Sequence, residues 1–207
     1  WVVTKGQQGT AGPVGPKGDR GLPGSVVEDG IDITKLARLS ALNLMGLNDH
    51  TDLSNMNLSG LNLSRANLHG ADLYRADLSK ANLSRANLSD AYLGDTDLSD
   101  AELSGAFLFQ AQFNAKTKID PKWRLVRDII TEGAVGKDLS NADLSGTYLD
   151  GVQLSDADLS STDLSIADLH HANLSGADLR GADLHWANLT EANLSGADLS
   201  GADLSGA

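Results

Sequence analysis

Leucine recurs at every fifth position through most of the chain, with a small residue, usually alanine, two positions earlier. The first series has 13 centres from Leu53 to Phe113, and the second has 14 centres from Leu139 to Leu204. Asp or Asn usually stands between the two apolar positions, and Ser usually follows the leucine. Each unit therefore has two positions predicted to point inward, two residues apart, followed by a corner.

A period of five fits neither regular element, because apolar residues recur about every 3.6 positions on a helix face and alternate along a strand. Residues 51–113 and 137–207 resemble the pentapeptide-repeat family. The resemblance implies an all-β fold, a right-handed square β-helix in which four repeats form one coil of about 20 residues. We expect about seven coils, stacked at the spacing of neighbouring strands, with leucine filling the interior.

Stacking of coils gathers aspartates into two columns on adjacent sides. These columns are Asp138, Asp158, Asp178 and Asp198, and Asp143, Asp163, Asp183 and Asp203. Residues 137–207 carry 12 acidic and 2 basic side chains, against 8 and 4 in residues 51–113. Three interpretations stay open for the columns: a solvated face that maintains solubility, mimicry of the DNA backbone, and weak binding of Ca²⁺.

The N-terminal 50 residues follow other patterns. Residues 1–25 carry glycine at every third position from Gly6 to Gly24, including Gly12, Gly15 and Gly18. This segment resembles collagen, in which only glycine fits the axis of the triple helix; a flexible arm is the alternative. Residues 26–50 are interpreted as degenerate first coils, with Leu39 and Leu44 at centres, or as a helical cap.

A second interruption, residues 114–136, shifts the five-residue frame by one position. Asp120, Pro121 and Gly133 are typical of a helix start and a helix end. One face of this predicted helix is apolar, and Phe107 and Phe109 precede it at outward positions. The apolar face consists of Trp123, Val126, Ile129 and Ile130. We expect the helix to dock on the outside of the stack against the two phenylalanines; a helix free to recruit a partner is the alternative.

The amino-acid composition limits the partners and the chemistry that we expect of the chain. Aromatic residues are 4% of the 207, there is no cysteine, and the net charge is −12. The charge disfavours nucleic acid and anionic membranes as partners, and no apolar run is long enough for a membrane span. No nucleotide-binding loop is present. His69, His170 and His185 follow central leucines, and the adjacent His170 and His171 are expected to diverge on extended backbone. We predict no catalytic, cofactor-binding or metal-binding residues, and no enzyme activity.

These observations favour a structural or assembly protein that forms an extracellular or cell-surface filament. Chain copies would stack head to tail, through Leu194, Leu199 and Leu204 at one end and Leu39, Leu44 and Leu53 at the other, or associate through the Gly-X-Y arm. The start at Trp1 fits a processed chain, which would suggest export, or a truncated one.

The alternative is a soluble acidic module, located in the cytoplasm, that binds a basic protein on its acidic faces. The resemblance implies one form of it, since some pentapeptide-repeat proteins mimic B-form DNA and bind DNA gyrase.

Overall fold

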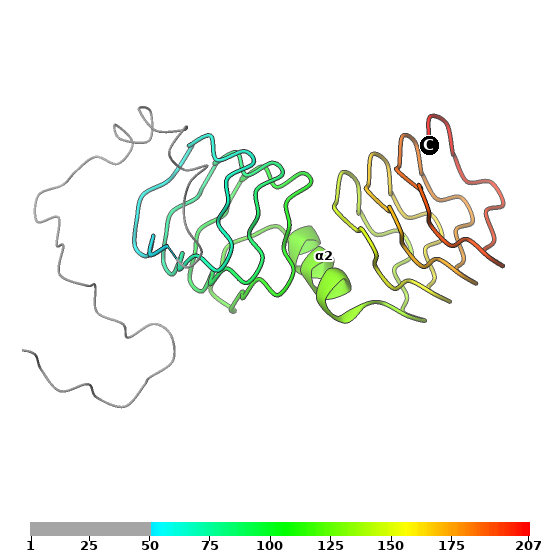
Figure 1. The fold of residues 1–207 in the computed structure, drawn as a ribbon, viewed down its shortest axis with the longest axis horizontal. Coiled ribbons are helices and arrows are strands. Elements are labelled where there is room, and N and C mark those ends of the chain that lie inside the picture. The colour runs from blue at the N-terminus through cyan, green and yellow to red at the C-terminus, as the bar shows by residue number, and fades with distance from the viewer. Residues whose placement is uncertain (1–50) are drawn as a thin grey trace, which may run out of the picture. The chain divides into compact units, whose positions relative to one another are not determined.

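Residues 51–207 form coils of parallel bridges in the computed structural model, which describes this part of the chain (Figure 1). Nearly every bridge joins residues twenty positions apart, for example Asp72 to Tyr92 and Asp138 to Asp158. Bridges occur at every fifth residue, so each coil has four sides, here named faces A to D in chain order. The fold is a β-solenoid.

The outward bridge residues define the four faces. Face A carries Asp52, Asp72, Tyr92, Gln112, Gln153, Asn173 and Asn193; face B carries Asn57, Asp77, Asp97, Lys118, Asp138, Asp158, Asp178 and Asp198. Face C carries Asn62, Asn82, Glu102, Asp143, Asp163, Asp183 and Asp203; face D carries Asn67, Asn87, Phe107, Tyr148, Asp168 and Asn188.

Each corner is a tight turn that the repeat sequence encodes locally. In the repeat Asp163–Ala167, the Leu164 carbonyl accepts from the Ala167 N–H at 3.1 Å, and Ile166 between them has φ +59°. A positive φ at the third residue of a four-residue turn favours Gly, Asn and Asp. Ser165 donates its backbone N–H to Oδ1 of Asp163 at 2.9 Å. This bond explains why Asp or Asn usually precedes the leucine, because the side-chain oxygen of either residue reaches the turn.

Leucine and alanine side chains fill the interior as one continuous cluster. Leu83, Leu93 and Leu164 are 0% exposed, and most of the alanines two positions before the leucines are buried as well. Thr96 and Thr162 replace alanine at two such sites. Their hydroxyls donate to the carbonyls of Leu73 (2.7 Å) and Leu139 (2.9 Å), so no hydroxyl is buried without a partner at these two positions.

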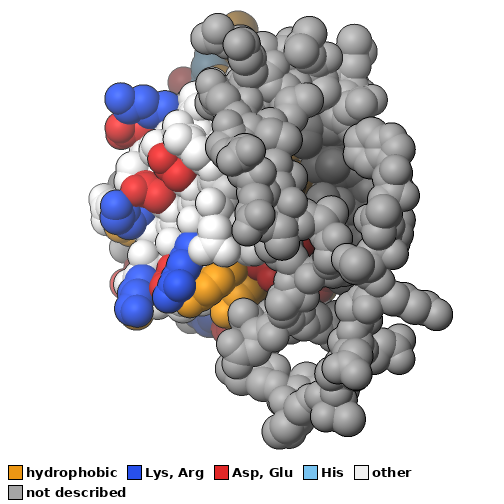
Figure 2. Space-filling model, turned by 90° about the vertical axis from the view of Figure 1, so that its left-hand side faces the viewer, with side chains coloured by type: hydrophobic (Ala, Val, Ile, Leu, Met, Phe, Trp, Pro, Cys, Tyr) orange, Lys and Arg blue, Asp and Glu red, His pale blue; other side chains and the backbone are white. Residues whose placement is uncertain are grey.

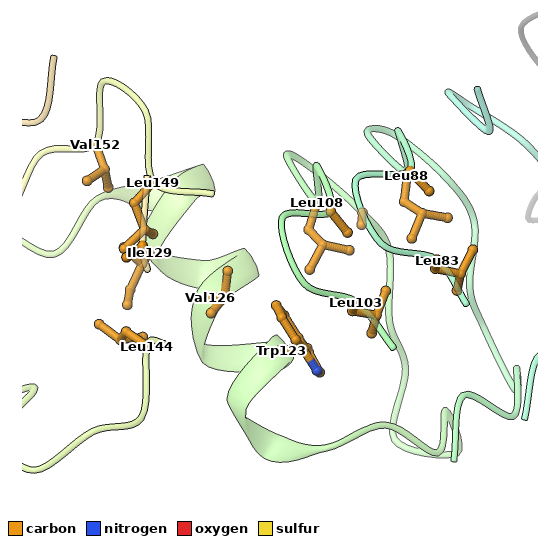
Figure 3. Packing of buried hydrophobic residues seen from close by; sticks show 14 of the residues in the cluster. Leu83, Leu88, Leu103, Leu108, Trp123, Val126, Ile129, Leu144, Leu149 and Val152 are labelled. Carbon is orange, nitrogen blue, oxygen red and sulfur yellow. The ribbon is translucent and has the colours of Figure 1, made fainter. Parts of the chain in front are cut away.

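A helix, α2 (Pro121–Glu132), interrupts the coils. Asp120 caps its start by accepting from the Lys122 N–H, and the Gly133 N–H bonds back to the Ile129 carbonyl. Trp123, Val126 and Ile129 are buried, with 8%, 0% and 2% exposure, in the same cluster as the leucines. Figure 3 shows Trp123 toward Leu103 and Leu108, and Ile129 toward Leu144 and Leu149.

The expectation that this helix docks on the outside against Phe107 and Phe109 is therefore wrong. Phe109 is 46% exposed, and the Phe107 ring contacts Tyr148, with 4.3 Å between ring centroids. The helix instead takes the place of faces C and D in one coil. It lies between Lys118 on face B and Gly133, which lies one coil before Gln153 of face A. The physical reason is that a helix inside the stack gives its apolar face leucine neighbours on both sides, whereas the exposed Phe109 and the Phe107 ring, already packed on Tyr148, offer little burial.

Because α2 takes the place of two sides, the coils before and after it meet directly at the corner between faces C and D. The Gly105 N–H donates to the Gly146 carbonyl at 2.8 Å, across 41 positions of sequence. Lys122 at the start of α2 donates to Asp143 Oδ1 (2.7 Å) and to the Ser145 carbonyl (2.8 Å) in the next coil. The helix thus joins the two repeat blocks into one stack.

The predictions for residues 1–25 and 26–50, including Gly12, Gly15, Gly18, Leu39 and Leu44, lie outside the described residues.

Candidate functional site

Most aspartates of faces B and C in residues 137–207 (the acidic faces) use one carboxylate oxygen for the fold and present the other outward. At Asp163, Ser165 donates both its N–H and its hydroxyl to Oδ1, at 2.9 and 2.6 Å. Ser200 and Ser205 do the same at Asp198 and Asp203. In all three, Oδ2 has no hydrogen-bond partner among the described residues. These hydrogen bonds lower the pKa of Asp198 and of Asp203, so both are ionised at neutral pH.

Few cations offset the acidic faces. Arg180 binds both carboxylate oxygens of Asp178 through Nε and Nη2 (2.6 to 3.0 Å), and Lys122 binds Asp143. Residues 51–113 carry less negative charge, because basic side chains are more numerous there and several columns carry asparagine. Figure 2, seen from the left-hand side of Figure 1, shows Lys and Arg side chains interspersed with acidic ones on the described surface. The negative charge is therefore concentrated on the second block.

A second polar cluster lies at the corner between faces D and A, where His170 and His171 come together. Their ring centroids are 3.6 Å apart, and His171 has φ +56°. The expectation that the two rings diverge is wrong, because the pair occupies a corner with positive φ and not an extended segment. Asp150, one coil earlier, joins them through His171 Nδ1 at 3.1 Å from its Oδ1. One ligand atom from each of the three residues lies within 4.8 Å of the others.

A hollow of about 370 Å³ lies at the junction that α2 creates, between the two blocks. Arg85 and Phe107 line it from the first block, and Tyr148, Ile166 and Asp168 from the second. Ile166 is 63% exposed. The hollow is shallow and holds no cluster of titratable groups comparable with the corner at His170.

The residues predicted to form stacking ends differ in burial. Leu53 is 7% exposed, Leu194 and Leu199 are partly buried, and Leu204 is 41% exposed. Sequence reasoning missed the cluster around Asp150. The twenty-residue stacking rule contains the signal, since it places Asp150 one coil below His170, and Glu191 one coil above His171.

Comparisons with known proteins agree with the repeat. A family profile described as "Pentapeptide repeats" matches in eight copies, at residues 49–85, 76–114, 138–173 and 167–206. The solved structure of HetL, a pentapeptide repeat protein involved in heterocyst differentiation regulation from Nostoc sp. strain PCC 7120, is 35% identical. The match covers 75% of this chain and 73% of HetL, with a TM-score of 0.33.

Two further solved structures are more distant. Rfr23 from Cyanothece 51142 is 25% identical over 83% of this chain and 95% of its own, with a TM-score of 0.26. Full-length QnrB1, a plasmid-mediated fluoroquinolone resistance protein, is 22% identical over 75% and 78%, with a TM-score of 0.26. No match was found among curated proteins. Within residues 51–207, no helix has the length and apolar character that crossing a membrane requires.

Proposed function

The chain belongs to the pentapeptide-repeat family, whose members are generally non-catalytic structural or binding proteins, and from this premise we propose that it is an acidic binding module for a basic protein partner. The observation that carries the proposal is the pair of acidic faces, on which successive aspartates keep an outward oxygen after capping their own turns.

The acidic faces suit recognition of a cationic surface for two reasons. The carboxylates repeat at the strand spacing of roughly 4.8 Å, so a partner with several lysines or arginines meets several of them at once. They are also held in place, because the backbone N–H two residues later, usually that of a serine, donates to Oδ1. Side chains that are already ordered lose less conformational entropy on binding, and complementary charge raises the association rate.

The natural repeat suggests a test that removes charge without removing turn caps. Asparagine occupies the same position at Asn62 and Asn193, where its Oδ1 accepts from the serine two residues later. The triple variant Asp163→Asn, Asp183→Asn, Asp203→Asn therefore removes three of the four aspartates of face C and leaves only Asp143, which Lys122 pairs. The matched control is Asp52→Asn, Asp72→Asn, Asp77→Asn. It removes an equal number of negative charges from the first block, where each aspartate also caps a turn.

Binding of a fluorescent 20-residue polylysine would be followed by anisotropy at several salt concentrations. We expect the face C variant to weaken binding at least tenfold and to flatten the salt dependence. We expect the control to weaken binding less than threefold. An equal loss of polylysine binding in both variants would contradict a localised acidic site. It would show that binding depends on net charge alone.

Mimicry of DNA is one form of this proposal, in which the basic partner is a DNA-binding protein. The roughly 4.8 Å spacing of the coils matches only loosely the phosphate spacing of about 3.4 Å along one strand. A supercoiling assay with DNA gyrase tests this form. No effect at micromolar protein would remove gyrase from consideration and leave the polylysine result standing.

Head-to-tail assembly into a surface filament stays a prediction. Negative-stain microscopy and light scattering across a hundredfold concentration range would test it, with fibres or rods expected. A monodisperse monomer at the highest concentration would contradict it.

A further inference from the structure

We propose that Asp150, His170 and His171 bind a divalent transition-metal ion of the zinc class at the corner between faces D and A. This inference is independent of the acidic faces and concerns a different ligand chemistry.

The corner brings the three side chains together through stacking and through the turn itself. Asp150 and His170 occupy the position after the central leucine in successive coils, so one lies above the other. His171 follows directly, at the positive-φ position, and the turn places its ring against the ring of His170, with 3.6 Å between ring centroids. Two imidazoles and one carboxylate form a donor set that suits zinc and related metals, whereas Ca²⁺ and Mg²⁺ favour oxygen-only sets.

Each of the three groups has an outer partner of the kind that orients metal ligands. His170 Nδ1 lies 2.8 Å from the Thr190 carbonyl; because a carbonyl only accepts, Nδ1 carries the proton and Nε2 keeps a lone pair. The Tyr148 hydroxyl donates to Asp150 Oδ2 at 3.0 Å, which leaves Oδ1 for another partner. His171 Nε2 lies 3.0 Å from Glu191 Oε2.

The contact between His171 and Asp150 is compatible with a cation bound between them. When His171 donates its Nε2 proton to Glu191, its Nδ1 carries a lone pair, 3.1 Å from a carboxylate oxygen that also carries lone pairs. Such a contact needs a positive charge between or upon the two groups, which either a proton or a metal ion supplies. A separation of 3.1 Å is close to the roughly 3.4 Å edge of a tetrahedron with zinc bonds of about 2.1 Å.

Only a small movement of the three ligand atoms is needed to bind an ion. One ligand atom from each residue lies within 4.8 Å of the others, so the widest gap closes by at most about 1.4 Å for tetrahedral geometry. His171 is 52% exposed and Asp150 31%, so their side chains have room to move and an ion can enter from solvent. Three protein ligands leave one position for water.

Repeat-compatible substitutions test the site without disturbing the coils. Serine is the usual residue after the central leucine, and Asn141 shows that asparagine accepts the positive-φ position. The variants are therefore His170→Ser and His171→Asn. The matched control is His185→Ser, a histidine at the same repeat position on the neighbouring corner, where its Nδ1 contacts Ser205 and its ring stacks on Trp186.

Zinc chloride would be titrated into the chelator-treated, tag-free chain at pH 7.5 by calorimetry, with the Co²⁺ absorption spectrum as a second readout. We expect one ion per chain, with a dissociation constant in the micromolar range and no displacement by millimolar Ca²⁺ or Mg²⁺. His170→Ser and His171→Asn should weaken binding at least tenfold, and His185→Ser less than twofold.

Three outcomes would overturn the proposal. They are no zinc binding at 1 mM, loss of binding in His185→Ser equal to that in His170→Ser, and displacement by Ca²⁺, which would place the ion on the acidic faces. The chain has no cysteine, so thiolates do not contribute to the signal.

Discussion

Truncating Val126 to alanine tests whether α2 belongs to the interior of the stack. Val126 is 0% exposed, whereas Val135, just after the helix, is 57% exposed. The same chemical change at the two positions therefore isolates the contribution of burial. We expect Val126→Ala to destabilise the whole solenoid and Val135→Ala to have little effect.

The expected loss in the free energy of unfolding follows from the burial of Val126. Valine loses two methyl carbons, each worth about 0.8 kcal/mol of transfer free energy when fully buried. A cavity that does not collapse adds up to about 1 kcal/mol, at roughly 24 cal/mol per Å³. The better helix propensity of alanine returns about 0.5 kcal/mol. The free energy of unfolding should therefore fall by about 2 kcal/mol for Val126→Ala, and by less than about 0.5 kcal/mol for Val135→Ala.

Urea unfolding, followed by far-UV circular dichroism and by tryptophan fluorescence, would measure both changes. A second measurement asks where α2 docks, through a double-mutant cycle of Val126→Ala with Phe109→Ala. We expect additivity, because these side chains are not packed on one another. A coupling above about 0.5 kcal/mol, or equal losses for Val126 and Val135, would refute the placement of the helix in the interior.

Three further predictions concern the repeat itself. Asp163→Ala should cost about 1 kcal/mol in urea unfolding, because Ser165 loses its acceptor, whereas Asp163→Asn, which keeps one, should be nearly neutral. Ile166→Gly should raise stability by about 1 kcal/mol, since a β-branched residue at φ +59° is strained; a lower melting temperature would contradict this. The hydrogen bond from Lys118 lowers the pKa of Asp97 to about 2, from 3.8. The stabilisation is therefore present above about pH 4 and lost as the pH falls toward 2. Lys118→Gln should shrink that loss and raise the pKa of Asp97 in an NMR titration.

Much of the fold follows from local pattern. The five-residue period predicts a β-solenoid, because each unit repeats the same turn and buries the same two positions, as at Leu164 and Ala167. Asp120 and Gly133, typical of helix ends, flank α2 in the structure. An apolar helix face indicates only that a partner exists, however, and does not identify it. The choice between Phe109 outside and the leucine interior therefore could not be made from the sequence.

The sequence by itself determined the coil, its leucine interior, the place of its corners and the outward position of its aspartates, since each follows from the pattern of the five-residue unit. Only the tertiary structure decided that α2 replaces two sides of a coil, that Gly105 meets Gly146, and that Asp150 joins His170 and His171. These contacts join residues 20 to 41 positions apart. Their geometry depends on how one coil rests on the next and on how a corner turns its side chains, which no single repeat encodes.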